Sequence, residues 1–100
     1  MKSPFQKPFL WFITSRLNSV VADDTPTAKA VTKACMRFAS GDWGEICAED
    51  KLYNNQDLSS REGHVLGRYH TPRGDIYINL VFDDPSMQSD IATIMFCEEY

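Results

Sequence analysis

The hydrophobic period of this chain changes from helical to extended along its length, and this change constrains the fold more than any other sequence feature. Between residues 31 and 38, apolar side chains recur at the i, i+3, i+4, i+7 spacing of one helix face: Val31, Ala34, Cys35 and Phe38. From His64 onwards, apolar and polar residues alternate instead, which is the period of a strand with one buried face. A chain that carries the two periods in separate segments is predicted to fold as an α+β protein.

Three strands are predicted after residue 63. They cover residues 64–71, 75–82 and 91–97, and the intervening sequences Pro72-Arg73-Gly74-Asp75 and Asp83-Asp84-Pro85-Ser86 are rich in turn-forming residues. Consecutive strands joined by short links pair as an antiparallel meander. We therefore expect a two-layer domain in which two or three helices cover the apolar face of this meander.

The first forty or so residues add further elements to this expectation. Residues 9–13 are aromatic and follow a proline, which indicates a short strand that would be the fourth of the sheet. Residues 15–22 fit a short helix. A longer helix is predicted to begin with Thr25 as N-cap and Pro26 in its first position. Residues 1–8 contain two prolines and are expected to form an irregular arm.

The segment Ser40-Gly41-Asp42-Trp43-Gly44-Glu45 combines residues that end a helix with residues that begin one. Gly41 is predicted to end the longer helix, because glycine adopts the left-handed conformation there without a steric cost. Asp42 and Glu45 match a capping box, which predicts a third helix running to about Leu58. Trp43 would pin the corner to the core, and Gly44 would allow another backbone to approach. We therefore predict structural roles for these five residues, from Gly41 to Glu45.

Length and charge limit the classes of function. One hundred residues form one domain, residues 1–100, with room for a single small core. The net charge of −4 disfavours direct binding of nucleic acid and suits a partner protein with a basic surface. Cys35, Cys47 and Cys97 are odd in number and far apart, which indicates reduced thiols in the cytoplasm. The apolar runs are too short to predict a membrane span.

No catalytic residue, metal ligand or cofactor is predicted from the motifs. The cysteines and histidines lack the short paired spacings of zinc sites. Cys47, near the start of the third predicted helix, is the best candidate for a nucleophile but lacks an activating sequence around it. An alternative is a small metal-dependent or carboxylate-based enzyme, for which the candidate residues are Glu45, Glu49, Asp50 and His70.

From residue 38 onwards, several short motifs occur together in this chain. They are Ser40-Gly41-Asp42-Trp43-Gly44-Glu45, Glu49-Asp50-Lys51 with Asn54, Leu66, Tyr69-His70-Thr71, Ile76-Tyr77-Ile78 and Glu98-Glu99-Tyr100. With these motifs the chain resembles a family of small proteins from plasmids, phages and integrative elements, some of which carry restriction-modification names. The chain departs from the family pattern at residues 83–90, which are longer and lack an arginine, and at Cys97, where the family tends to have proline.

The resemblance, the small size and the acidic balance together suggest a non-enzymatic binding protein of a mobile genetic element. Such a protein would inhibit a host defence complex, of the anti-CRISPR or anti-restriction type, by covering a basic surface. The chain would be a monomer or a weak homodimer without nucleic-acid or membrane contacts. The predicted partner-binding residues are Glu49, Asp50, Asp83, Asp84, Glu98, Glu99, Tyr69 and Tyr77. A further alternative is a structural or regulatory subunit that self-associates through an open strand edge.

Overall fold

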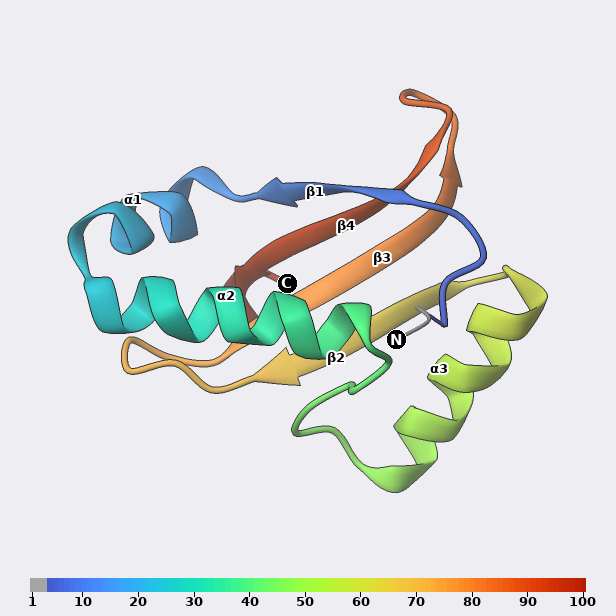
Figure 1. Cartoon of the computed structure of the whole chain (residues 1–100), viewed down its shortest axis with the longest axis horizontal. Helices are drawn as coiled ribbons and strands as arrows, with labels where there is room; N and C mark the ends of the chain where they lie inside the picture. The colour runs from blue at the N-terminus through green and yellow to red at the C-terminus, as the bar shows by residue number, and fades with distance from the viewer. Residues whose placement is uncertain (1–3) are drawn as a thin grey trace.

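A four-stranded sheet, in the order β1-β4-β3-β2, forms one layer of the molecule, and helices form the other (Figure 1). The computed structural model describes residues 4–100. The elements in chain order are β1 Phe9–Ile13, α1 Ser15–Asp23, α2 Thr25–Ala39, α3 Ala48–Ser60, β2 His64–Tyr69, β3 Ile76–Asp84, β4 Ser89–Phe96 and a short 3₁₀ helix, η1, Cys97–Glu99. The predicted α+β class is therefore confirmed.

The strands β2, β3 and β4 pair as the antiparallel meander that the alternating sequence predicts. The N-terminal strand β1 joins the same sheet and runs parallel to β4, with Leu10 beside Ile91 and Phe12 beside Thr93. This position makes β1 one edge of the sheet and β2 the other (Figure 1). The irregular arm is confirmed for residues 4–8, and the rest of the predicted arm lies outside the described residues.

The core lies between α2 and one face of the sheet. The side chains Val31, Ala34 and Phe38 of α2 are buried, as their helical spacing predicts. Opposite them, the inward positions of β3 and β4 are also buried: Ile76, Ile78, Leu80, Ala92, Ile94 and Phe96. Because successive residues of a strand point to opposite faces, the remaining positions of β3 and β4 lie on the other face of the sheet.

The start of α2 differs from the prediction by one residue. Asp24, and not Thr25, is the N-cap, and its carboxylate accepts a hydrogen bond from the backbone N–H of Thr27 at 3.2 Å. The end of α2 is as predicted, since Gly41 has a φ of 87° and its N–H donates to the carbonyl of Phe38. The N–H of Asp42 donates to the carbonyl of Arg37, which completes a Schellman motif.

The predicted start of the third helix is wrong. The helix does not begin at Asp42, and Asp42 and Glu45 form no capping box. Helix α3 begins only at Ala48, and residues 43–45 instead run beside β2. The N–H of Arg68 donates to the carbonyl of Trp43 at 3.1 Å, and the N–H of Glu45 donates to the carbonyl of Arg68 at 2.7 Å. The edge of β2 offers unpaired backbone groups, and the hydrogen bonds that residues 43–45 make to them replace the helix start that the local sequence predicts.

Gly44 lies where residues 43–45 approach β2 most closely. Its φ is 77°, and an added Cβ would overlap the carbonyl oxygen of Arg68 and lie 2.8 Å from the ring of Tyr69. The prediction that Gly44 permits the close approach of another backbone is thus confirmed. Trp43 is buried, as predicted, and its ring lies 5.3 Å from that of Phe38.

Candidate interaction surface

The sheet face opposite the helices has no covering layer among the described residues. In Figure 1, α2 crosses one face of the sheet and α3 lies beside β2. The opposite face, here called the open face, carries the alternate side chains of all four strands. They are Leu10, Phe12, His64, Leu66, Arg68, Tyr77, Asn79, Val81, Ile91, Thr93 and Met95. The open face is therefore a surface of mixed apolar and polar side chains that the described elements do not cover.

Apolar side chains are most exposed at the β1 end of the open face and near the end of β3. Leu10, Phe12 and Val81 are 40%, 45% and 40% exposed. Single exposed apolar residues are common on protein surfaces, but these three lie on one face of one sheet. Within that face, Asn79 places a buried side-chain oxygen that has no hydrogen-bond partner among the described residues.

An aromatic and charged cluster occupies another part of the open face. The rings of Tyr77 and Tyr100 lie 5.3 Å apart, so the C-terminal residue folds back onto this face. The guanidinium of Arg68 lies 5.8 Å from the ring centre of Tyr77 and donates to Asp75 at 2.8 Å. Tyrosine and arginine are enriched in the energetically important parts of protein interfaces. Tyr77, one of the predicted partner-binding residues, therefore lies on the open face, and its role in binding stays a prediction.

Two side chains, His70 and Arg68, contact the carboxylate of Asp75 next to this cluster. His70 Nδ1 lies 2.6 Å from its carboxylate, and hydrogen bonds from His70 and then from Arg68 lower the pKa of Asp75. Cys97 lies in the same hollow as Arg68 and Asp75. Its pKa is raised, chiefly by burial, so its thiol remains protonated and is a poor nucleophile. Burial therefore disfavours thiolate chemistry at Cys97.

The predicted acidic contacts lie in three separate places. Asp83 and Asp84 lie at the end of β3, and Glu98 and Glu99 lie in η1 at the opposite end of the sheet (Figure 1). Glu49 and Asp50 lie in the first turn of α3. The structure thus brings these carboxylates together in pairs and does not form one acidic patch from all six.

Several of these carboxylates already have partners within the chain. Asp83 pairs with Lys7 and Arg61, and Glu98 pairs with Arg16. Glu99 accepts hydrogen bonds from the Thr14 hydroxyl at 3.0 Å and from a backbone N–H at 2.7 Å. The pairs Lys7–Asp83 and Arg16–Glu98 are exposed on both sides, and such pairs contribute little to stability, so Asp83 and Glu98 could exchange these cations for a partner's.

The prediction that Tyr69 belongs to the partner-binding surface is wrong. The residue is 1% exposed, and its hydroxyl donates to the carbonyl of Asp42 at 2.7 Å. The guanidinium of Arg37 lies 5.3 Å from its ring centre and helps to cover it. The alternation of β2 places Tyr69 on the helix-facing side, so it belongs to the core and is not available to a partner.

Three of the residues named for the alternative enzyme have different partners within the chain. Glu49 accepts a hydrogen bond from Tyr53, His70 contacts Asp75, and Glu45 lies 3.8 Å from Arg37. Within residues 4–100, no group of three or more histidine, cysteine, aspartate or glutamate side chains is placed to hold a metal ion. Among residues 4–100, the metal-dependent alternative therefore has no cluster of candidate ligands.

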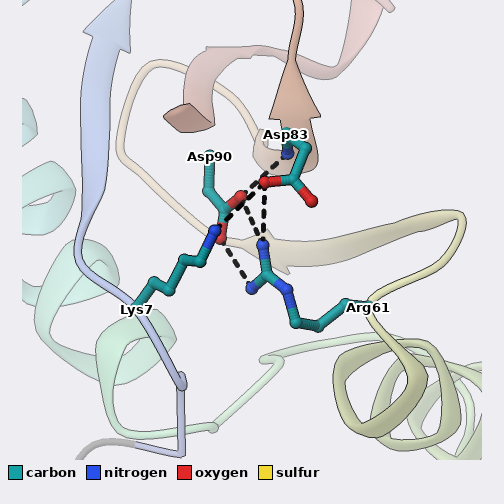
Figure 2. A network of polar contacts seen from close by, with 4 residues as sticks. All are labelled: Lys7, Arg61, Asp83 and Asp90. Atoms are coloured by element: carbon teal, nitrogen blue, oxygen red, sulfur yellow. Dashed lines mark hydrogen bonds and ion pairs between the residues drawn. The ribbon is translucent and has the colours of Figure 1, made fainter. Parts of the chain in front are cut away.

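A buried ion pair fixes the end of the sheet where β3 turns into β4 (Figure 2). Arg61, at the end of α3, donates to both oxygens of Asp90 at 2.8 and 2.9 Å. Asp90 is buried and also accepts the backbone N–H of Asp83 at 2.8 Å, while Lys7 and Arg61 contact the Asp83 carboxylate. Hydrogen bonds from Arg61 lower the pKa of Asp90. The network joins the arm before β1, α3 and the β3–β4 turn.

The sequence reasoning missed this pair, although a signal was present. Asp90 has the same strand parity as the inward residues Ala92, Ile94 and Phe96. A carboxylate at an inward position requires a cation or several hydrogen bonds, because burying an unpaired charge is costly. Three arginines, Arg61, Arg68 and Arg73, precede Asp90 within about thirty residues and would have been candidates for that cation.

The two edges of the sheet differ in what covers them. At the covered edge, β2, residues 43–45 supply backbone partners, and the Asn54 side chain binds both the N–H and the carbonyl of Leu66, at 3.1 and 2.8 Å. At the open edge, β1, only β4 is a neighbour among the described residues. The exposed side chains at this edge are Leu10, Trp11 and Phe12.

Known proteins do not provide a template for these surfaces. Comparison with protein-family models, with curated proteins and with solved structures found no match to this chain. No helix among residues 4–100 has the length and apolar composition needed to cross a membrane. The functional argument therefore depends on the geometry of the open face and of the two edges.

Proposed function

We propose that this chain is a non-enzymatic binding protein of a mobile genetic element, and that it acts in the cytoplasm by covering a surface of a host defence complex. The complex would be a CRISPR effector or a restriction enzyme. The observation that carries the proposal is the uncovered sheet face with its exposed Leu10, Phe12 and Val81. The mobile-element setting is supported by the resemblance of residues 38–100.

The open face has the chemistry of a protein contact. Its apolar side chains would supply affinity through burial, at about 25 cal/mol for each Å² of apolar surface removed from water. Tyr77, Tyr100 and Arg68 would act as the anchoring side chains, because they combine a large contact area with hydrogen-bonding groups. No part of this contact requires a catalytic residue or a cofactor.

The acidic pairs flank this face and suit a partner with a basic surface. Asp83 and Asp84 lie at one end of the sheet, and Glu98 and Glu99 at the other. Defence nucleases use basic surfaces to bind nucleic acid. Negative charge at both ends of an apolar contact would orient the chain on such a surface and accelerate association, an effect that salt weakens.

The proposal is tested by expressing the chain in bacteria that restrict phage through a defined CRISPR or restriction system. The wild-type chain is expected to raise the plating efficiency of the targeted phage, and Val81→Arg is expected to abolish this protection. Met36→Arg serves as the matched control, because Met36 is 69% exposed on α2, away from the open face. Protection by Val81→Arg at the wild-type level, or no protection by the wild-type chain in any system, contradicts the proposal.

A further inference from the structure

The outer side of β1 offers a row of backbone groups without a strand to bind. The N–H of Thr14 donates to the carbonyl of Ile94 at 3.0 Å, which fixes the phase of the parallel ladder between β1 and β4. In a parallel ladder, alternate residues of one strand make both bonds to the neighbour. Leu10 and Phe12 therefore bond to β4, and the N–H and carbonyl groups of Phe9, Trp11 and Ile13 point outward.

Nothing in the sequence of β1 protects this edge from pairing. The five residues Phe-Leu-Trp-Phe-Ile contain no charge, no proline and no glycine. Edge strands of monomeric proteins usually carry lysine, proline or a bulge that prevents pairing with another chain. Trp11 is 41% exposed although its ring packs against Phe9 and Phe38. The edge is thus held rigidly while its outer side remains available.

We propose that two copies of this chain pair through β1, antiparallel and centred on Trp11, to form one continuous sheet. This register places Phe9 of one copy opposite Ile13 of the other, and Trp11 opposite Trp11. In an antiparallel ladder, residues in such pairs exchange both hydrogen bonds. Every outward N–H and carbonyl of β1 then finds a partner, because the outward residues are symmetric about Trp11.

Charge makes β1 the part of the surface where two copies repel each other least. Each copy carries a net charge of −4, so most surfaces of two copies repel each other. The β1 strand is neutral, and the cations that flank it are paired within their own chain, Lys7 with Asp83 and Arg16 with Glu98. Pairing would also place Leu10 of one copy beside Phe12 of the other on the open face, which buries apolar surface on both. A five-residue strand pair is small, so we expect a dimer in the micromolar range or weaker.

The test is sedimentation of the full chain over a wide concentration range, with a charge-swap pair at the central position. Trp11→Lys and Trp11→Glu each place like charges opposite each other and are expected to weaken dimerisation at least about tenfold. An equimolar mixture is expected to form a heterodimer, because opposite charges then face each other. Met36→Lys, on an exposed part of α2, is expected to dimerise like the wild type.

A second measurement needs no substitution at the interface. Amide hydrogen exchange of the wild-type chain is expected to slow with concentration at Phe9, Trp11 and Ile13, whereas Leu10 and Phe12 are protected at every concentration. A wild-type chain that remains monomeric at the highest concentration overturns the proposal. This result is expected if an extended segment of another protein, and not a second copy, pairs with β1. Dimerisation of Trp11→Lys at wild-type strength, or a mixture that stays monomeric, overturns it as well.

Discussion

Both edges of the sheet carry outward backbone N–H and carbonyl groups that no strand of the sheet binds. Among residues 4–100, other parts of the chain bind these groups at one edge and not at the other. At the covered edge, β2 gains hydrogen bonds from Trp43, Glu45 and Asn54, all of which come from the segment between α2 and β2. At the open edge, β1 gains only the ladder to β4. An uncovered edge is a site where another chain can pair. The difference shows that β2 is stabilised by other parts of its own chain, whereas β1 keeps outward backbone groups that a second chain could bind.

The comparison also explains what the segment from Gly41 to Glu45 does. Gly41 ends α2, Trp43 anchors the segment in the core, and Gly44 lets it lie against β2. Asp42 accepts the N–H of Gly44 at 3.0 Å and pairs with Arg37 at 2.8 Å, which holds the segment in place. These residues cover an edge, so their structural role does not depend on any ligand.

The largest effect is expected from Gly44→Ala at the covered edge. The new Cβ would overlap the carbonyl of Arg68 and take a φ of 77°, so residues 43–45 would have to leave β2. We expect a loss of about 4 kcal/mol in the free energy of unfolding, measured by urea denaturation. Gly74→Ala is the control, since its Cβ would have no contact closer than 3.9 Å, and only about 1 kcal/mol is expected. Equal losses for the two variants would mean that Gly44 has no special contact.

The next largest effect is expected from Arg61→Ala, which leaves the buried Asp90 without its cation. Breaking one side of a buried ion pair costs about 3 kcal/mol. Lys7→Ala removes the exposed cation of the same network and is expected to cost less than about 1 kcal/mol. A Lys7 variant that is as unstable as the Arg61 variant would show that the network acts as a unit and not through Asp90.

The same pair gives the stability a defined dependence on pH. Hydrogen bonds from Arg61 lower the pKa of Asp90 in the folded chain. The stabilisation is therefore fully present above the unfolded pKa of about 3.9 and is lost as the pH falls through the folded value. We expect Arg61→Ala to flatten the decline of unfolding free energy below about pH 4, measured by urea titrations across that range. An unchanged slope would assign the acid sensitivity to Asp42 and Asp75, whose pKa values are also lowered.

A smaller effect is expected from Asn54→Ala, again at the covered edge. This change removes the side chain that binds both backbone groups of Leu66 and leaves them inside the molecule without partners. We expect a loss of about 2 kcal/mol in urea denaturation, together with faster exchange of the Leu66 N–H. Gln56→Ala, at an exposed position of the same helix, is expected to stay within about 0.5 kcal/mol of the wild type.

The features predicted correctly from the sequence are those that local patterns decide. The spacing of Val31, Ala34 and Phe38 predicted the buried face of α2, and alternation predicted the meander. Gly41 was predicted to end α2 because its left-handed conformation follows from the residue type alone. Periodicity and turn chemistry depend on residues that are close in the sequence, so the elements that they predict here are present in the folded chain.

The features that were missed depend on residues far apart in the sequence. The parallel pairing of β1 with β4 joins the two ends of the chain. Asp42 and Glu45 match a capping box locally, but the segment that contains them pairs with the edge strand β2 instead. Of the predicted partner-binding residues, Tyr77 lies on the open face and Tyr69 lies in the core. The face to which each side chain points depends on how its strand pairs with its neighbours. The remaining contacts of the predicted surface stay predictions.

The smallest effect on the isolated monomer is expected at the open edge. Leu10→Thr replaces an exposed side chain that lies on the open face, keeps a residue suited to strands, and leaves the ladder to β4 intact. We expect a change of at most about 0.5 kcal/mol in urea denaturation at low protein concentration. At high concentration the same variant should fall further below the wild type, because its dimer lacks the apolar contact between Leu10 of one copy and Phe12 of the other, and a weaker dimer stabilises the folded chain less. A constant difference at all concentrations would mean that the Leu10 side chain contributes nothing to association at the open edge.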